Sequence, residues 1–292
     1  MSRAALVLLA LLTALAVSYI WRWVVLERRR QAAAAPPGVV QALIGFITNF
    51  FDTLGVGSFA PTTSVFKLLK LVPDERIPGT LNAGHALPTV AQALIFIAAV
   101  SVDPLTLITM ITAAVAGAWI GSGVVARLSR RVIQAGMGAA LLAAAALFVL
   151  GNLHAIPAGG AALELSGARL AVAVVCNFFL GALMTLGVGL YAPCLILVSL
   201  LGMSPIAAFP IMMGSCAFLM PVAGVRFISA GSYDRRAALG LALGGIPGVL
   251  IAAYVVKQLP LEWLRWLVVI VVLYAAVAML RAAHQDARST AN

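Results

Sequence analysis

The stretch "TLGVGSFAP" at residues 53–61 decides the fold, because it interrupts a hydrophobic segment that would otherwise predict one continuous membrane helix. Gly55 and Gly57 allow positive φ angles and a close approach of the backbone to a ligand. Pro61 suits the first turn of a new helix, where its missing N–H needs no partner. The stretch therefore predicts a helix end, a glycine turn and a second helix start. The same phrase returns 132 residues later as "TLGVGLYAP" at 185–193.

The composition is that of a membrane protein. Of the 292 residues, 63% are hydrophobic and 10% are charged, whereas soluble domains carry about a quarter charged residues. The formal net charge of +10 would suggest a nucleic-acid partner in a soluble chain. Here the basic residues occupy short loops between apolar runs, so membrane topology explains them better. We expect an all-α, polytopic protein of the inner (plasma) membrane that binds no nucleic acid.

Apolar stretches divide the chain into full spans and interrupted spans. Splitting an interrupted stretch at its GVG sequence leaves half-helices such as 59–72, about 21 Å long, which is shorter than the ~30 Å hydrocarbon core. Each interrupted stretch is therefore predicted to be a helical hairpin that returns to the side from which it entered. The predicted full spans are 4–26, 77–100, 104–126, 132–152, 205–226, 236–257 and 261–281, and the interrupted stretches are 39–72 and 168–203.

The distribution of basic residues predicts the orientation. We place the sequence "ERRR" at 27–30 in the cytoplasm and let both hairpins return to their own sides. A strong positive-inside bias results, with the N-terminus outside and the C-terminus in the cytoplasm. Of the 19 basic residues, all fall on the cytoplasmic side except Arg3, Arg169, Lys257 and Arg265.

Matched glycines and prolines predict two repeats in the chain. Residues 45–88 align without gaps with 177–220, and 117–128 resembles 248–259 with a shift of one residue. Since repeat 1 makes three crossings, repeat 2 begins on the opposite face, and inverted repeats with broken helices are typical of secondary transporters. The expected organisation is an N-terminal transmembrane helix (1–30), a linker (31–38), repeat 1 (39–153), an extracytoplasmic loop (154–167), repeat 2 (168–283) and a cytoplasmic tail (284–292).

The two turns predict a site for a small anion. A helix that begins at membrane depth exposes free N–H groups and the positive end of its dipole, and this combination binds anions. The alternative is a glycine motif for close helix packing. The predicted substrate-binding residues are Gly55, Val56, Gly57, Ser58, Pro61, Thr62, Gly187, Val188, Gly189, Tyr191, Pro193 and Cys194, with Asn82 as a further candidate.

Asp52 and His85 are ionisable residues inside predicted membrane segments. Such residues usually face a cavity or a partner, and histidine titrates near physiological pH. They form either a proton relay that couples anion movement to the proton gradient or a structural hydrogen bond, and a neutral His85 could also cap a carbonyl. Arg226 either attracts anions to a vestibule or snorkels to the headgroups. We expect Trp21 and Trp23 to act as interfacial anchors.

With the turns "GVGSFAP" and "GVGLYAP" and the run "GAWIGSGVVARLSRR" in view, the chain resembles the TauE/SafE family of membrane permeases over about residues 39–281. Members of that family are described as exporters or permeases of sulfite, organosulfonates and related small anions. The resemblance implies that class of substrate, whereas the residues alone imply only a small anion.

The favoured function is a secondary active transporter, either proton-coupled or driven by membrane potential. A passive anion channel is one alternative, and an intramembrane enzyme that uses Asp52 and His85 is another. No Ser-His-Asp arrangement, H-E-x-x-H sequence or carboxylate pair supports the enzyme, so no catalytic residues are assigned. The three cysteines lack metal-ligand spacing, and no metal or cofactor is predicted. The oligomeric state is left open.

Overall fold

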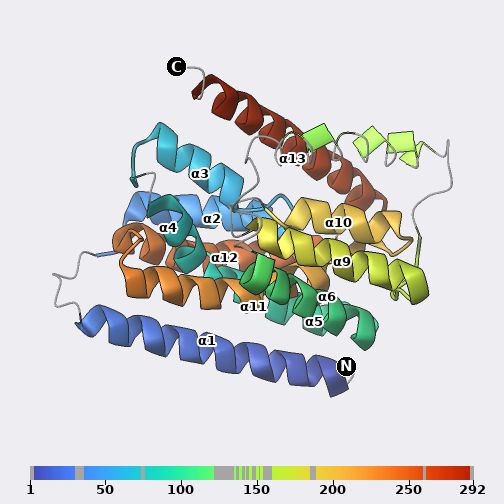
Figure 1. Cartoon of the computed structure of the whole chain (residues 1–292), viewed down its shortest axis with the longest axis horizontal. Coiled ribbons are helices and arrows are strands. Elements are labelled where there is room, and N and C mark those ends of the chain that lie inside the picture. Colours follow the sequence, from blue (N-terminus) through green and yellow to red (C-terminus); the bar gives the residue numbers. More distant parts are fainter. Residues whose placement is uncertain are drawn as a thin grey trace.

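The protein forms a bundle of helices that lie roughly side by side along its long axis (Figure 1). In the part of the chain that is described, the one element of β type is an isolated bridge between Ala162 and Met203. The computed structural model describes residues 3–29, 36–73, 76–121, 160–184, 189–258 and 261–289, together with short pieces between 135 and 153.

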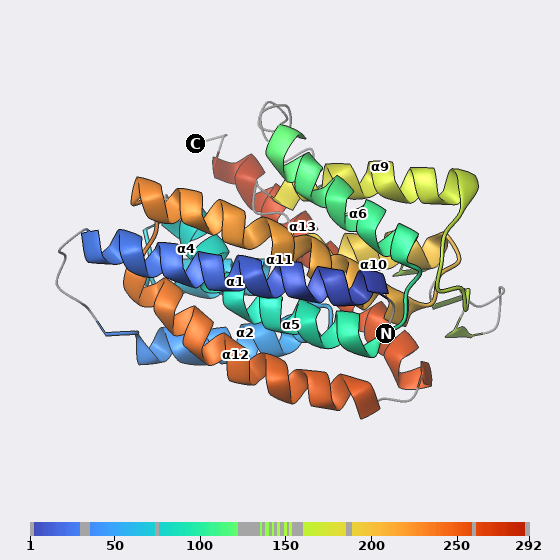
Figure 2. The same cartoon turned by 90° about the horizontal axis from the view of Figure 1, so that it is seen from below.

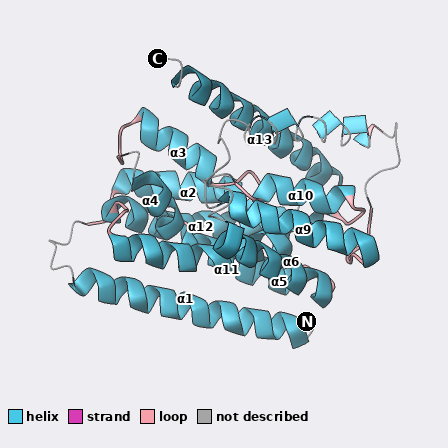
Figure 3. Cartoon of the chain, in the orientation of Figure 1, coloured by secondary structure: helices cyan, strands magenta, loops and turns pink. Residues whose placement is uncertain are grey.

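The helices follow the apolar stretches of the sequence closely (Figure 3). A π-helical turn, Gly117–Gly121, continues the sixth helix. The α-helices are α1 (Arg3–Arg29), α2 (Val39–Thr53), α3 (Phe59–Leu68), α4 (Ile77–Gly84), α5 (Ala86–Ala99), α6 (Pro104–Ala116), α9 (Gly167–Met184), α10 (Tyr191–Leu200), α11 (Pro205–Ala230), α12 (Arg235–Gln258) and α13 (Leu261–Ser289).

Length and composition confirm the membrane class. Five helical stretches within the described residues are long and apolar enough to cross a membrane. The predicted span 132–152 lies mostly outside the described residues, and 104–126 is described as far as Gly121. The five stretches are Arg3–Arg29, Ile77–Ala99, Gly167–Met184, Pro205–Ala230 and Arg235–Val255.

Each GVG sequence falls where one helix stops and another begins. In Figure 1, α2 runs from the left end of the bundle towards the middle, and α3 returns to the left. By contrast, α9 enters from the right end and α10 returns to the right. The two chain reversals therefore lie in the interior of the bundle. The arm α9 has 18 residues, whereas α2 has 15.

Glycines allow the halves of the chain to pack with their backbones in contact. A Cβ atom at Gly248 in α12 would lie 2.3 Å from the carbonyl oxygen of Phe46 in α2. A Cβ atom at Gly117, after α6, would lie 1.8 Å from the carbonyl oxygen of Phe178 in α9. Such small-residue contacts let membrane helices approach closely. They also fit the predicted alignment, which matches Gly117 with Gly248 and Phe46 with Phe178.

The N-terminal helix α1 lies across the bundle alongside α11 (Figure 2), and polar contacts hold it there. The Tyr19 hydroxyl donates to the carbonyl oxygen of Ala83 at 2.9 Å, and the Trp23 indole N–H donates to the Tyr233 hydroxyl at 3.2 Å. Trp23 therefore connects α1 to the bundle. The sequence predicted an interfacial anchor at this position and did not indicate the inward contact. Trp21, by contrast, is exposed.

The backbone contact at Gly248 predicts a packing-sensitive site. Gly248→Val should lower the melting temperature of the detergent-purified protein, because a side chain would separate α12 from α2 at a cost of about 1–3 kcal/mol. Gly189→Ala is the matched control, since no described atom lies within 4 Å of a Cβ at Gly189. Equal melting temperatures for the two variants would show that the α2–α12 contact does not limit stability.

Candidate functional site

The first turn has the backbone that its glycines predict. After α2 ends at Thr53, Gly55 and Gly57 adopt φ angles of 99° and 86°, which side chains on an L-residue disfavour. The Gly55 N–H donates to the carbonyl oxygen of Asp52 at 2.8 Å, which closes the end of α2. Pro61 is the third residue of α3, where no helical N–H is required.

The second turn resembles the first in the position of its proline and in the space beside its second glycine. Gly187 and Val188 lie outside the described residues. Pro193 is the third residue of α10, as Pro61 is of α3. No described atom lies within 4 Å of a Cβ placed at Gly57 or at its counterpart Gly189. Both turns therefore border space that other described residues leave open.

A buried hydrogen-bond network joins the two hairpins. The side-chain amide of Gln92 in α5 donates to the Asp52 carboxylate at 2.8 Å and to the Thr53 hydroxyl at 3.0 Å. The Tyr191 hydroxyl, at the start of α10, donates to the Gln92 carbonyl oxygen at 2.6 Å. Ser58, just before α3, also donates hydrogen bonds to Asp52 from its backbone N–H and its hydroxyl. The Asp52 carboxylate therefore lies next to the start of α3.

His85 belongs to a neighbouring part of this network. Its Nε2 lies 3.1 Å from the Thr62 hydroxyl, and its Nδ1 contacts the side-chain amide of Asn49. The direct Asp52–His85 hydrogen bond that was one interpretation of the sequence is not among the described contacts. Asp52 and His85 are connected through the residues between them. Thr53, which follows Asp52, donates from its hydroxyl to the carbonyl oxygen of Asn49 at 2.7 Å, and the Asn49 side chain contacts His85.

The other predicted residues lie either beside the turns or in the hydrophobic core. Val56 is half-buried and packs against the hydrophobic core, and Cys194 is fully buried in α10. A Cβ at Gly55 would lie 3.8 Å from the Met212 side chain and 4.0 Å from Leu195, so this glycine lies in the contact between the hairpins. Ser58, Thr62 and Tyr191 remain as polar groups around the turns.

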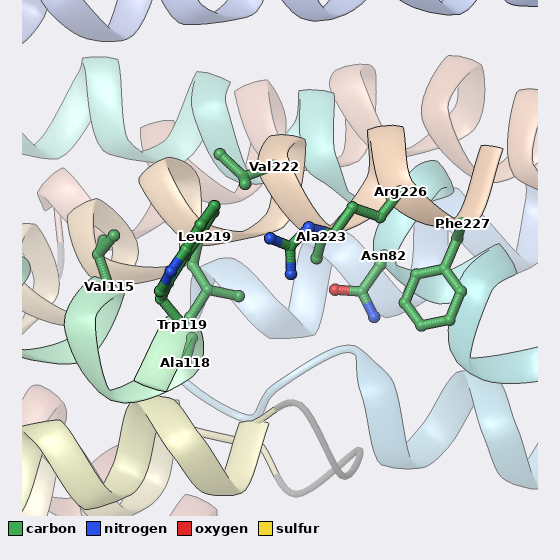
Figure 4. A pocket seen from close by; sticks show the side chains of 9 residues that line it. All are labelled: Asn82, Val115, Ala118, Trp119, Leu219, Val222, Ala223, Arg226 and Phe227. Carbon is green, nitrogen blue, oxygen red and sulfur yellow. The ribbon is translucent and has the colours of Figure 1, made fainter. Parts of the chain in front are cut away.

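Asn82 lies apart from the turns, in the wall of a cavity of about 200 Å³ (Figure 4). The Asn82 Nδ2 donates to the Pro78 carbonyl oxygen at 2.9 Å. Across the cavity the Arg226 guanidinium lies over the Trp119 ring, with 4.3 Å between its Cζ atom and the ring centroid, which is within the range of a cation–π interaction. The remaining lining residues are Val115, Ala118, Leu219, Val222, Ala223 and Phe227.

Two residues matter more here than the sequence indicated. Gln92 and Asn49 were not among the residues that the sequence singled out, yet Gln92 contacts both broken hairpins and Asn49 contacts His85. The signal in the sequence was their position. An amide side chain inside an apolar span must find buried partners, and Gln92 follows His85 by two helical turns. Within the described residues, no group of three or more His, Cys, Asp or Glu side chains could hold a metal ion.

The fold and the site define a membrane helical bundle with two interrupted hairpins. A family model for the sulfite exporter TauE/SafE family matches residues 2–148 and 170–292. The chain belongs to the TauE/SafE sulfite exporter family. The match begins at residue 2 and so includes α1, whereas the resemblance was expected to begin near residue 39. No curated protein and no solved structure matches the chain.

The bridging position of Gln92 generates a prediction about stability. Gln92→Leu should destabilise the protein by about 1–3 kcal/mol, because it removes the amide donor to Asp52 and the acceptor for Tyr191. Thermal unfolding in detergent measures the effect. Gln41→Leu, at a buried position at the outer end of α2, is the control. An unchanged melting temperature for Gln92→Leu would mean that water replaces both hydrogen bonds.

Proposed function

We propose that this protein is a secondary active transporter that exports a small anion, sulfite or an organosulfonate, across the plasma membrane. The observation that carries the proposal is the meeting of two interrupted hairpins at one buried network, Tyr191–Gln92–Asp52. The anion would bind near the membrane midplane between the two turns and move by alternating access. Membership of a sulfite exporter family supports the substrate class.

The proposal includes two inverted repeats, 39–153 and 168–283, with the N-terminus outside and the C-terminus in the cytoplasm. Reciprocal contacts support it. The Asn177 side chain donates to the Met110 carbonyl oxygen at 2.7 Å, and at the matched positions a Cβ at Gly45 would lie 2.5 Å from the Leu241 carbonyl oxygen. The opposite directions from which the hairpins enter the bundle (Figure 1) also fit an inverted pair.

The chemistry of the first turn favours coupling to protons. Asp52, near the end of α2, places its buried carboxylate next to the start of α3, where the substrate anion is proposed to bind. A charged carboxylate and an anion in the same apolar surroundings would repel each other strongly. Protonation of Asp52 would remove that repulsion, so anion binding and proton binding would favour each other. His85, linked to this site through Asn49, is the second proposed coupling residue.

The open space beside Gly57 and Gly189 leads to a prediction about the site. Gly57→Val and Gly189→Val should abolish uptake of labelled sulfite into proteoliposomes, because the new side chains would fill the space where the anion binds. Their effect on folding should be small, apart from about 1–2 kcal/mol of strain at the positive φ of Gly57. Gly167→Val, at an exposed glycine with a φ angle of 54°, controls for strain. Normal uptake by both folded site variants would contradict the proposed site.

The proposed coupling predicts how transport depends on pH. Wild-type uptake should rise as the pH falls, since protonation neutralises Asp52. Asp52→Asn mimics the neutral carboxyl group and should give uptake that no longer responds to pH or to an imposed pH gradient. His85→Ala should also weaken the response. Uptake by Asp52→Asn that keeps the wild-type pH profile would remove the coupling role, and uptake that does not saturate with sulfite would indicate a passive channel.

A further inference from the structure

We propose that the cavity between Arg226, Trp119 and Asn82 is a second binding site for a small oxyanion, a vestibule from which the paired turns are loaded. This inference rests on the proposed transport function, because a vestibule needs a pathway to supply. The ligand class is an oxyanion that carries one O–H or N–H donor, such as hydrogensulfite or an amino- or hydroxysulfonate. Arg226 would bind the negatively charged oxygens of this ligand, and Asn82 would accept a hydrogen bond from its O–H or N–H group.

Among the described residues, none compensates the positive charge that Arg226 presents to the cavity. No carboxylate forms an ion pair with it among the described residues, whereas Arg235, nearby in sequence, binds Glu27 at 2.9 Å. The Trp119 ring holds the guanidinium from one side by a cation–π interaction. The guanidinium N–H groups that do not face the ring can bind the oxygens of an oxyanion, and two of them can do so in a bidentate manner.

Asn82 adds selectivity to the charge. It is 5% exposed, and because its Nδ2 donates to Pro78, its Oδ1 is left as an acceptor. Figure 4 shows this oxygen on the side of Asn82 that faces Arg226. A fully deprotonated oxyanion would face an unfavourable acceptor there, whereas an oxyanion with a hydrogen would satisfy it. The other seven lining residues, Trp119 included, supply no acidic side chain.

The position of the cavity links it to the proposed transport site on two helices. On α4, Asn82 precedes His85 by three residues, about one helical turn, and His85 contacts Thr62. On α11, the face that carries Arg226, Ala223 and Leu219 continues to Cys216, which contacts Met184 at the end of α9. Through these two helices the cavity is connected to residues that contact the hairpins. Its volume of about 200 Å³ would hold a small anion with a few waters, each of about 30 Å³.

The location of Arg226 also specifies a side of the membrane. Arg226 lies in the last turns of α11, towards the end of the bundle at which α12 and α2 begin (Figure 1). The charge distribution assigns that end to the cytoplasm. The vestibule would therefore collect anions from the cytoplasmic side, as an exporter requires.

The test is side-resolved transport of labelled sulfite by the full chain in vesicles of each orientation. Arg226→Gln should raise the KM from the cytoplasmic side about tenfold, the loss expected for one charge-assisted contact, with kcat and the KM from the other side unchanged. Arg226→Lys should recover part of the loss. Arg76→Gln removes an exposed charge outside the cavity and is the matched control.

Variants of Asn82 provide a second test of the vestibule. Asn82→Asp should raise the KM for sulfite more than Asn82→Ser does. The aspartate would compensate the positive charge of Arg226 and repel the anion, whereas serine keeps a hydroxyl acceptor. An equal KM for Arg226→Gln and wild type, or an equal increase for Arg76→Gln, would overturn the vestibule while leaving the proposed transport intact. A wild-type protein that neither transports nor binds labelled sulfite would overturn both.

A lipid phosphate has the same chemistry and could also bind Arg226. The measurements are therefore made in neutral phosphatidylcholine vesicles and again with phosphatidylglycerol added. A vestibule for free anions keeps the difference between wild type and Arg226→Gln in both membranes. A difference that exists only with phosphatidylglycerol would assign Arg226 to the headgroups and overturn the proposal.

Discussion

Gln92 connects the two interrupted hairpins, which lie far apart in the sequence. Its amide donates to Asp52 and Thr53 at the end of α2, and its carbonyl accepts from Tyr191 at the start of α10. Inside an apolar bundle each of these groups needs a partner, since an unpaired buried polar group costs roughly 1–3 kcal/mol. The network thus fixes both interrupted hairpins against α5.

Close backbone packing makes this network possible. The α2–α12 and α6–α9 contacts bring carbonyl oxygens against glycines at matched positions of the two halves. A larger side chain at either contact would separate the helices that support the turns. Packing and polar chemistry therefore act together: glycines bring the helices close, and the buried amides then reach partners on neighbouring helices.

The arrangement also suggests why a carboxylate lies beside a proposed anion site. In the proposed mechanism the buried Asp52 carboxylate lies next to the start of α3, where a substrate anion would bind, and it would repel that anion when ionised. Arg226, near the end of α11, provides a positive charge in the separate cavity, where it lies over the Trp119 ring. Repulsion at the turns and attraction in the vestibule would make progress of the anion depend on protonation.

Hydropathy and the fixed register of glycines and prolines were enough to predict the helical membrane class, the positions of both chain reversals and the family. The alignment also matched Gly57 with Gly189. The folded structure was needed to find that Asp52 contacts Gln92 and Ser58 and not His85, that Trp23 faces inward, and that Arg226 lies over Trp119. Those contacts join residues far apart in the chain, and their partners depend on helix rotation and distance, which local sequence patterns do not specify.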